Sequence, residues 1–144
     1  MRKSAREVAF MLIYESLFNK ERDVELSFDF FSKEFETEKD VFGENALDIE
    51  DEVYVKQIIC LFEANREQIE TMIKNNIFGY ETDRLYKVDM ALLDLAVTEI
   101  YHYKTAPAIV INEILEIAKK YSTEKSAKFI NGILGSILKE YPVE

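Results

Sequence analysis

Apolar residues recur every three or four positions along most of the chain, which is the spacing of one face of an α-helix. The first predicted helix runs from about Lys3 to Asn19, and its inward face consists of Ala5, Val8, Ala9, Leu12 and Ser16. A second segment shows the same spacing at Val24, Phe28, Phe31 and Phe35. Residues 36–47 are mostly polar and contain Gly43, so they are predicted to form a loop.

A third and longer helical segment starts near Asp48, where acidic residues in the first turn suit the positive end of the helix dipole. Its length indicates a bend or break near Asn65 and Arg66, and Gly79 is predicted to end it. The fourth helix follows Asp83 and presents one apolar stripe, formed by Val88, Leu92, Leu95 and Ala96.

The last two helices have the clearest patterns. Pro107 suits the first turn of the fifth helix, because its missing N–H would be unpaired there in any case. Ser122 or Thr123 is predicted to cap the sixth, whose buried face holds Ala127, Ile130, Ile133, Leu134, Ile137 and Leu138. Six or seven helices with short connections and no convincing strand predict an all-α fold, one compact domain over residues 1–144. The sequence leaves open whether the domain divides into two three-helix halves.

Composition removes several classes of function. No apolar run reaches the ~20 residues of a membrane span, and no export signal precedes the first helix, so a cytoplasmic protein is expected. Cys60 lies in an apolar run and is predicted to be a small buried residue in a reducing cytosol. His102 has no Ser or Cys partner in a recognisable arrangement, and the four glycines form no phosphate-binding loop. We therefore expect no catalytic residue, metal or cofactor, and Glu99 is predicted to be a buried carboxylate paired with a helix terminus or a lysine.

Charge is unevenly distributed along the chain. The formal net charge is −10, which argues against nucleic-acid binding over the whole surface. Between Arg22 and Glu52 there are twelve acidic residues and three basic ones, whereas residues 106–144 hold five of each. The acidic stretch is either a solvated face or a device that repels RNA from the wrong side.

Two clusters of cations stand out against this acidic background. Arg2, Lys3 and Arg6 share a side of the first helix with Phe10 and Tyr14. Cations beside aromatic rings suit single-stranded RNA, because phosphates meet the charges and unstacked bases meet the rings. Core packing is the alternative for Phe10, and a position at the rim of the core is the alternative for Tyr14.

The second cluster lies on the sixth helix, opposite its apolar stripe, and consists of Lys125, Lys128, Phe129, Gly132, Gly135 and Ser136. Glycine on an exposed helix face costs roughly 1 kcal/mol relative to alanine. Such glycines suit a surface that a protein or nucleic-acid backbone approaches closely. Packing against another helix of the same bundle is the alternative.

Three motifs together resemble the NusB family of bacterial transcription antitermination factors. They are RKSARE at residues 2–7, VDMALLDLA at residues 88–96 followed by Glu99, and the stretch from Ile111-Asn112-Glu113 to Asn131-Gly132. The third motif is the most specific, whereas residues 20–80 contribute only a helical pattern. A related helical domain is fused to some RNA cytosine methyltransferases, and because this chain ends at Glu144 the free-standing factor is expected.

The resemblance implies an all-α fold of two packed helical bundles and a non-catalytic RNA-binding adaptor. Its expected partners are NusE, a ribosomal protein, the boxA element of nascent transcripts, notably ribosomal RNA, and the RNA polymerase antitermination complex. The RNA-binding positions carried over are Arg2, Lys3, Arg6, Lys128, Phe129 and Asn131. The positions expected to contact NusE are Tyr14, Asp89, Tyr121 and Lys125.

The chain also departs from the family pattern. Ser4 shortens the N-terminal basic run, and Met90 and Asp94 stand where the family commonly has cations. These departures predict weak RNA binding by the isolated protein, strengthened by a basic partner. The alternatives are a protein-interaction module or homodimer in which RNA binding is weak or lost, and an RNA-binding relative of the ribosomal RNA cytosine methyltransferases.

Overall fold

A computed structural model describes residues 3–36, 46–77 and 86–143 of the chain. Within these ranges it contains helices and no strands, which confirms the all-α prediction. The α-helices are α1 (Lys3–Ser16), α2 (Val24–Ser32), α3 (Ile49–Ala64), α4 (Arg66–Lys74), α5 (Lys87–Val97), α6 (Pro107–Tyr121) and α7 (Glu124–Glu140). A short 3₁₀ turn, η1 (Lys33–Phe35), follows α2, and a π-helical turn, η3 (Thr98–His102), follows α5.

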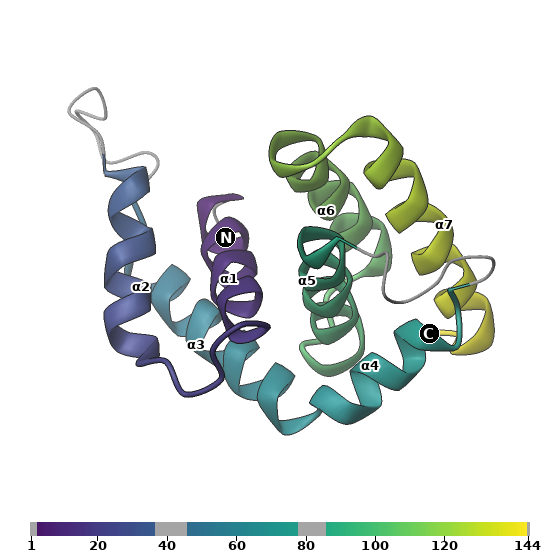
Figure 1. Cartoon of the computed structure of the whole chain (residues 1–144), viewed down its shortest axis with the longest axis horizontal. Coiled ribbons are helices and arrows are strands. Elements are labelled where there is room, and N and C mark those ends of the chain that lie inside the picture. Colours follow the sequence, from purple (N-terminus) through teal and green to yellow (C-terminus); the bar gives the residue numbers. More distant parts are fainter. Residues whose placement is uncertain (1–2, 37–45, 78–85, 144) are drawn as a thin grey trace.

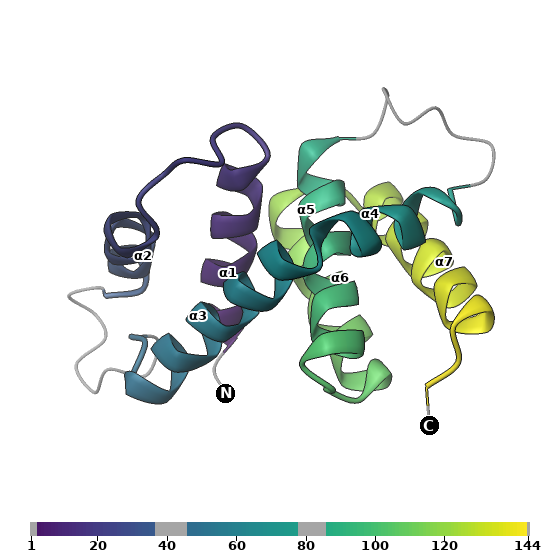
Figure 2. The ribbon, with the colours of Figure 1, turned by 90° about the horizontal axis from the view of Figure 1, so that it is seen from below.

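The helices form two groups, as Figure 1 shows: α1, α2 and α3 on one side, and α5, α6 and α7 on the other. The consecutive helices α3 and α4 run along the underside of both groups (Figure 2). Helix α1 packs against both α3 and α5, so it lies at the junction of the two groups. The division into two three-helix halves that the sequence left open is therefore present, with α4 packed against α3, α5 and α7.

Local sequence signals account for most helix starts. Asp23 caps α2, and Asp48 and Asp51 form a reciprocal capping box at the start of α3, with N–H···O distances of 2.8 and 3.1 Å. Pro107 stands in the first turn of α6, as predicted. Thr123, rather than Ser122, caps α7 by accepting a hydrogen bond from the backbone of Ser126 at 3.0 Å.

The predicted break in the long third segment lies at Asn65. Its backbone leaves the helical region, with φ −119° and ψ 15°, and its side-chain amide donates to the Leu61 carbonyl at 2.9 Å. The side chain thereby satisfies a carbonyl at the end of α3. The end expected at Gly79 and the start expected after Asp83 both lie outside the described residues.

The core draws on every helix, and the predicted inward face of α1 is buried throughout. Helix α5 differs from its prediction, because every residue from Ala91 to Ile100 is buried and not only one stripe. A helix that is apolar all round belongs in the centre of a fold. Cys60 also differs, because it lies on the outward side of α3 and is exposed, so the prediction of a buried cysteine was wrong.

Asp94 is the most unusual residue of α5. Its side chain is fully buried, and neither carboxylate oxygen has a hydrogen-bond partner among the described residues. Burial raises the pKa of Asp94 from 3.8 to about 8, with the charge of Glu70 adding to the shift and that of Arg66 opposing it. Asp94 therefore folds as the neutral acid and places no charge on the surface. Met90, the other departure, is half-buried against the core.

We predict that Asp94→Asn flattens the pH dependence of folding. Between pH 4 and 8 the unfolded chain has lost the Asp94 proton and the folded chain keeps it, so raising the pH favours unfolding. Relative to the variant, the parent should lose roughly 1 kcal/mol of stability per pH unit in this window, and no further stability above it. Urea unfolding at several pH values measures the difference. Parallel pH profiles for the two proteins would contradict the buried, protonated carboxyl.

Candidate nucleic-acid interface

The predicted N-terminal cations separate in the structure. Arg2 lies outside the described residues, and Lys3 is exposed at the start of α1, where it pairs with Glu116 of α6. Arg6 is only 5% exposed, and its guanidinium Nε and Nη2 donate to the Glu99 carboxylate at 2.6 to 3.0 Å. Arg6 is therefore part of the interior, and the prediction that it lines an RNA surface is not compatible with this geometry.

The Glu99 carboxylate accepts hydrogen bonds from three parts of the chain. Besides Arg6, the hydroxyl of Tyr54 on α3 donates to it at 3.2 Å and that of Thr105 at 3.3 Å. Burial alone would lower the pKa of Arg6, but the hydrogen bonds and charge of Glu99 outweigh it and the net shift is upward. Burial and then the charge of Glu99 raise the pKa of Tyr54. Glu99 is thus the predicted buried carboxylate, although its partner is an arginine and not a lysine or a helix terminus.

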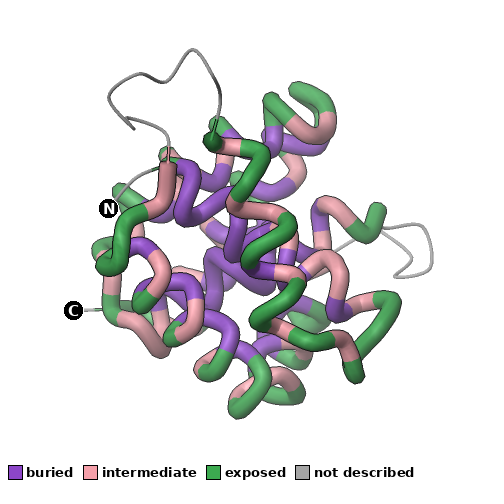
Figure 3. Tube along the Cα trace, turned by 90° about the vertical axis from the view of Figure 1, so that its left-hand side faces the viewer, coloured by how far each residue is buried: buried purple, intermediate pink, exposed green. Residues whose placement is uncertain are grey.

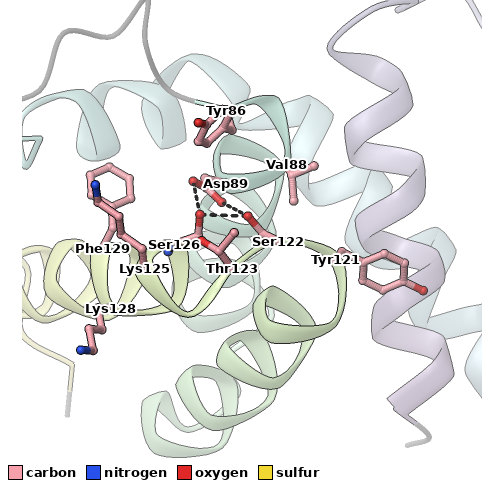
Figure 4. Close-up of a pocket in the computed structure, with 10 residues that line it drawn as sticks. All are labelled: Tyr86, Val88, Asp89, Tyr121, Ser122, Thr123, Lys125, Ser126, Lys128 and Phe129. Atoms are coloured by element: carbon pink, nitrogen blue, oxygen red, sulfur yellow. Dashed lines mark hydrogen bonds between the residues drawn. The ribbon is translucent and has the colours of Figure 1, made fainter.

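The C-terminal cluster opens onto a groove between α5 and the start of α7, with a volume of about 860 Å³. Figure 4 shows the groove with its side chains. Lys125 and Lys128 are exposed, and Phe129 is half-buried against the core. The groove is lined by Tyr86, Val88, Asp89, Tyr121, Ser122, Thr123, Lys125, Ser126, Lys128 and Phe129.

The groove has a polar cluster that the helix caps create. The Asp89 carboxylate accepts from the Ser126 hydroxyl at 3.0 Å and from that of Ser122 at 3.4 Å, and Ser122 donates to Ser126 at 2.9 Å (Figure 4). Asp89 is 3% exposed. Burial raises its pKa, and the two serine hydroxyls partly oppose the shift. The cluster fixes α7 to α5 at the point where the groove lies.

A row of aromatic rings leads from the groove along α1. Tyr121 is directed toward α1 (Figure 4) and its ring centroid lies 5.4 Å from that of Phe10. Phe10 contacts Tyr14 at 6.2 Å, and Tyr14 contacts Phe18 at 5.1 Å. Phe10 is buried and belongs to the core, whereas Tyr14 is half-buried and Phe18 is 63% exposed. Tyr14 therefore lies at the rim of the core, the alternative position given for it from the sequence.

Residues predicted for two different partners meet in this groove. Lys128 and Phe129 were expected to contact RNA, whereas Asp89, Tyr121 and Lys125 were expected to contact a protein, and all five line it. Asn131 is exposed on α7 and Tyr14 lies on α1, both outside the lining.

Sequence reasoning missed Tyr86, Val88, Thr123 and Ser126 as groove residues and treated Ser122 only as a helix cap. Tyr86 could have been noticed as an aromatic residue directly before α5. The sequence holds no comparable signal that Val88, Ser122, Thr123 or Ser126 lines a groove.

The two glycines of α7, the exposed Gly132 and the half-buried Gly135, have no packing role within the described chain. A Cβ atom built at Gly132 or at Gly135 meets nothing within 4 Å. The alternative that these glycines allow close packing inside the bundle therefore does not hold. Gly132 follows Lys128 and Phe129 by about one turn, so the surface beside them is open.

Other chemistry is sparse among the described residues. Across residues 3–36, 46–77 and 86–143, no group of three or more His, Cys, Asp and Glu side chains is placed to hold a metal ion. In the same ranges no helix has the length and apolar character needed to cross a membrane. His102 lies at the end of η3, where burial and then the charge of Lys104 lower its pKa.

Comparison with known proteins decides the family. Residues 3–139 match the model of the NusB family. The transcription antitermination protein NusB of Clostridium botulinum (strain Kyoto / Type A2) is 39% identical over 142 residues, covering 95% of this chain and 99% of that protein. The chain belongs to the NusB family.

Solved structures of the NusB family share the fold. A chain from the crystal structure of the antitermination factors NusB and NusE in complex with double-stranded RNA superposes with a TM-score of 0.79 at 28% identity, covering 97% of both chains. NusB of T. maritima gives a TM-score of 0.78 at 27% identity, covering 99% of this chain and 94% of that one.

The Arg6–Glu99 pair predicts a large loss of stability on substitution. Arg6→Ala would leave a buried carboxylate without its countercharge, which typically costs about 3–5 kcal/mol. Chemical unfolding followed by circular dichroism measures the change. Lys3→Ala is the matched control on the same helix and should leave the unfolding curve nearly unchanged, because that pair is exposed to solvent. Equal effects of the two substitutions would contradict the interior role of Arg6.

Proposed function

We propose that this chain is a non-catalytic RNA-binding adaptor in transcription antitermination, which acts as a heterodimer with a NusE-type ribosomal protein. The observation that carries the proposal is the groove of α5 and α7, where Lys125 and Lys128 border aromatic rings and an open glycine surface. The similarity to NusB proteins, one of them crystallised with NusE and RNA, supports the same role. The proposed RNA is single-stranded boxA of nascent transcripts, notably ribosomal RNA, within the RNA polymerase antitermination complex.

The chemistry of the groove suits RNA in two ways. Lys125 and Lys128 are exposed and can neutralise phosphates, while Phe129 and Tyr86 offer rings on which unstacked bases can lie. Asn131 extends the polar surface along α7 and can donate and accept hydrogen bonds at base edges. Lys3 and Arg2 remain proposed phosphate contacts at the other end of the surface, whereas Arg6 acts through the fold.

The partner protein is proposed to cover the aromatic row and the polar end of the groove. Tyr14 and Tyr121 present partly exposed rings, and Lys125 supplies an exposed cation. Asp89 is buried and is proposed to act through its hydrogen bonds to Ser122 and Ser126, which hold this end of the groove in place. A protein on this side would lie beside the RNA and add its own phosphate contacts. Such help matters here because the chain has a net charge of −10 and because Lys3 is paired with Glu116.

We predict that Lys128→Ala and Phe129→Ala weaken RNA binding in different ways. Loss of one phosphate contact should reduce the slope of log affinity against log salt by about 0.7 for a single strand. Loss of a stacking ring should lower affinity by roughly tenfold with little change of slope. Fluorescence anisotropy with a boxA oligonucleotide, with and without NusE across a salt series, measures both.

The control for these variants is Lys139→Ala, which removes an exposed lysine from the last turn of the same helix. It should leave affinity and slope unchanged. A scrambled strand and a duplex of the same sequence serve as competitors. The proposal of single-stranded RNA fails if the duplex competes better than the single strand. The assignment of α7 fails if Lys128→Ala and Phe129→Ala behave like the control Lys139→Ala.

Gly132→Ala should separate stability from binding. Alanine is favoured over glycine in a helix by roughly 1 kcal/mol, and the new methyl group meets nothing in the folded chain. The variant should therefore unfold at higher urea concentration yet bind RNA more weakly, because the methyl group occupies space beside Lys128 and Phe129. Gly135→Ala, about one turn further along, should give the stability gain alone. Unchanged RNA affinity in Gly132→Ala would contradict close approach at this position.

A further inference from the structure

Helix α2 has a second surface that the proposed RNA adaptor does not use. Its inner face packs on α1 through Phe28, which is buried, and Ser27 donates a hydrogen bond to Glu15 of α1 at 2.9 Å. Its outer face carries Leu26 and Phe30, each 68% exposed. Residues four apart lie above one another on a helix, so these two side chains form one apolar stripe.

The stripe is bordered by carboxylates. At about 100° per residue, Glu25 and Asp29 fall on one side of it. Glu34 follows in η1, past the end of α2. Between Asp23 and Glu36 the sequence has five acidic residues and one lysine. Lys56 of α3 reaches Glu25 at 2.9 Å and Glu52 at 2.8 Å, so α3 adjoins this side of α2. Helix α3 continues the pattern there with Ile49 and Val53, which are 79% and 48% exposed, beside Glu50 and Glu52.

The stripe is remote from the groove. Figures 1 and 2 show α2 at the outer edge of the first helix group, with α1 between it and α5, α6 and α7. Figure 3 views the molecule from the α2 side, and exposed positions recur along the helix nearest the viewer. A partner on α2 would therefore leave the groove of α5 and α7 accessible.

We propose that the outer face of α2, formed by Leu26 and Phe30 beside Glu25 and Asp29, is a docking site for a basic protein segment. The occupant is an amphipathic helix or peptide that places apolar side chains on Leu26 and Phe30 and lysines or arginines against the flanking carboxylates. Charge complementarity selects this occupant. Nucleic acid and anionic lipid are repelled by the carboxylates, and a second copy of this chain would bring the same negative charge to the interface.

The site gives the chain two separate interfaces of opposite chemistry. Cations and rings on α7 suit an anionic polymer, whereas carboxylates and apolar side chains on α2 suit a cationic one. The acidic stretch of the sequence is then a specific binding surface as well as a solvated face. Both interfaces can be occupied at once, because they lie on opposite helix groups.

A peptide titration of the ¹⁵N-labelled full chain tests the proposal. The probe is a synthetic helical peptide with leucines at i, i+4 spacing and flanking lysines, and its control is the same peptide with glutamates in place of the lysines. The basic peptide should shift the backbone amides of residues 24–36 and bind about tenfold more weakly when salt is raised from about 50 to about 300 mM. The acidic peptide should not bind.

Variants make the result specific. The double substitution Leu26→Ser, Phe30→Ser should lower peptide affinity at least about tenfold without unfolding the chain, because both side chains are mostly exposed. Ile109→Ser removes a comparably exposed apolar residue from α6 and should leave affinity unchanged. RNA binding at α7 should be the same in the parent chain, the double variant and Ile109→Ser. A failure of the α2 docking site can therefore be told apart from a failure of the proposed RNA-binding function.

Four results would overturn the proposal. They are absence of binding by the basic peptide, equal binding by the acidic peptide, amide shifts at α2 caused by RNA, and concentration-dependent shifts at α2 in the chain alone. The third would assign the face to nucleic acid, and the fourth would assign it to a second copy of the chain.

Discussion

A buried ion pair between Arg6 and Glu99 determines how the two helix groups meet. Arg6 belongs to α1 in the first group, and Glu99 belongs to the π-helical turn after α5 in the second. A lone charge in the interior is strongly disfavoured, so Arg6 and Glu99 must contact each other whenever the chain is folded. Tyr54 of α3 and Thr105 add hydrogen bonds to the same carboxylate, which ties three helices to one point. Glu99 lies in the π-helical turn that follows α5.

This constraint also shapes the surface that is proposed to bind RNA. With Arg6 held inside, α1 presents Lys3 beside α6 and its aromatic side toward Tyr121, so the rings form a continuous row to the groove of α7. The second fixed point is the Asp89, Ser122 and Ser126 cluster, which sets the start of α7 against α5. Lys128 and Phe129 are thus positioned by hydrogen bonds one turn earlier on the same helix. Among its described residues the proposed RNA surface has three exposed lysines, Lys3, Lys125 and Lys128, which agrees with an adaptor that depends on its protein partner for affinity.

Much of the secondary structure followed from the sequence because the signals are local. Capping residues such as Asp48 and Thr123, the proline at the start of α6 and the break at Asn65 each act within a few residues of themselves. The spacing of apolar residues gave the buried face of α1 and, except for the half-buried Leu138, that of α7 for the same reason. It was less informative for α5, where a central position buries the helix all round, and for Cys60, whose apolar neighbours face inward while it faces out.

The sequence by itself determined the all-α fold class, most helix starts, and the exposed position of Lys125 and Lys128 on the last helix, whereas α1 ends at Ser16 and not at the predicted Asn19. Helical periodicity and capping carry that information, since both depend on residues close together in the chain. Only the tertiary structure decided that Arg6 is internal, that Asp94 is buried without a partner, and that Asp89 joins Ser126 in the groove. Each of these outcomes depends on contacts or burial contributed by residues far apart in sequence. Only when the helices pack is it decided whether a charged side chain faces water or a buried partner.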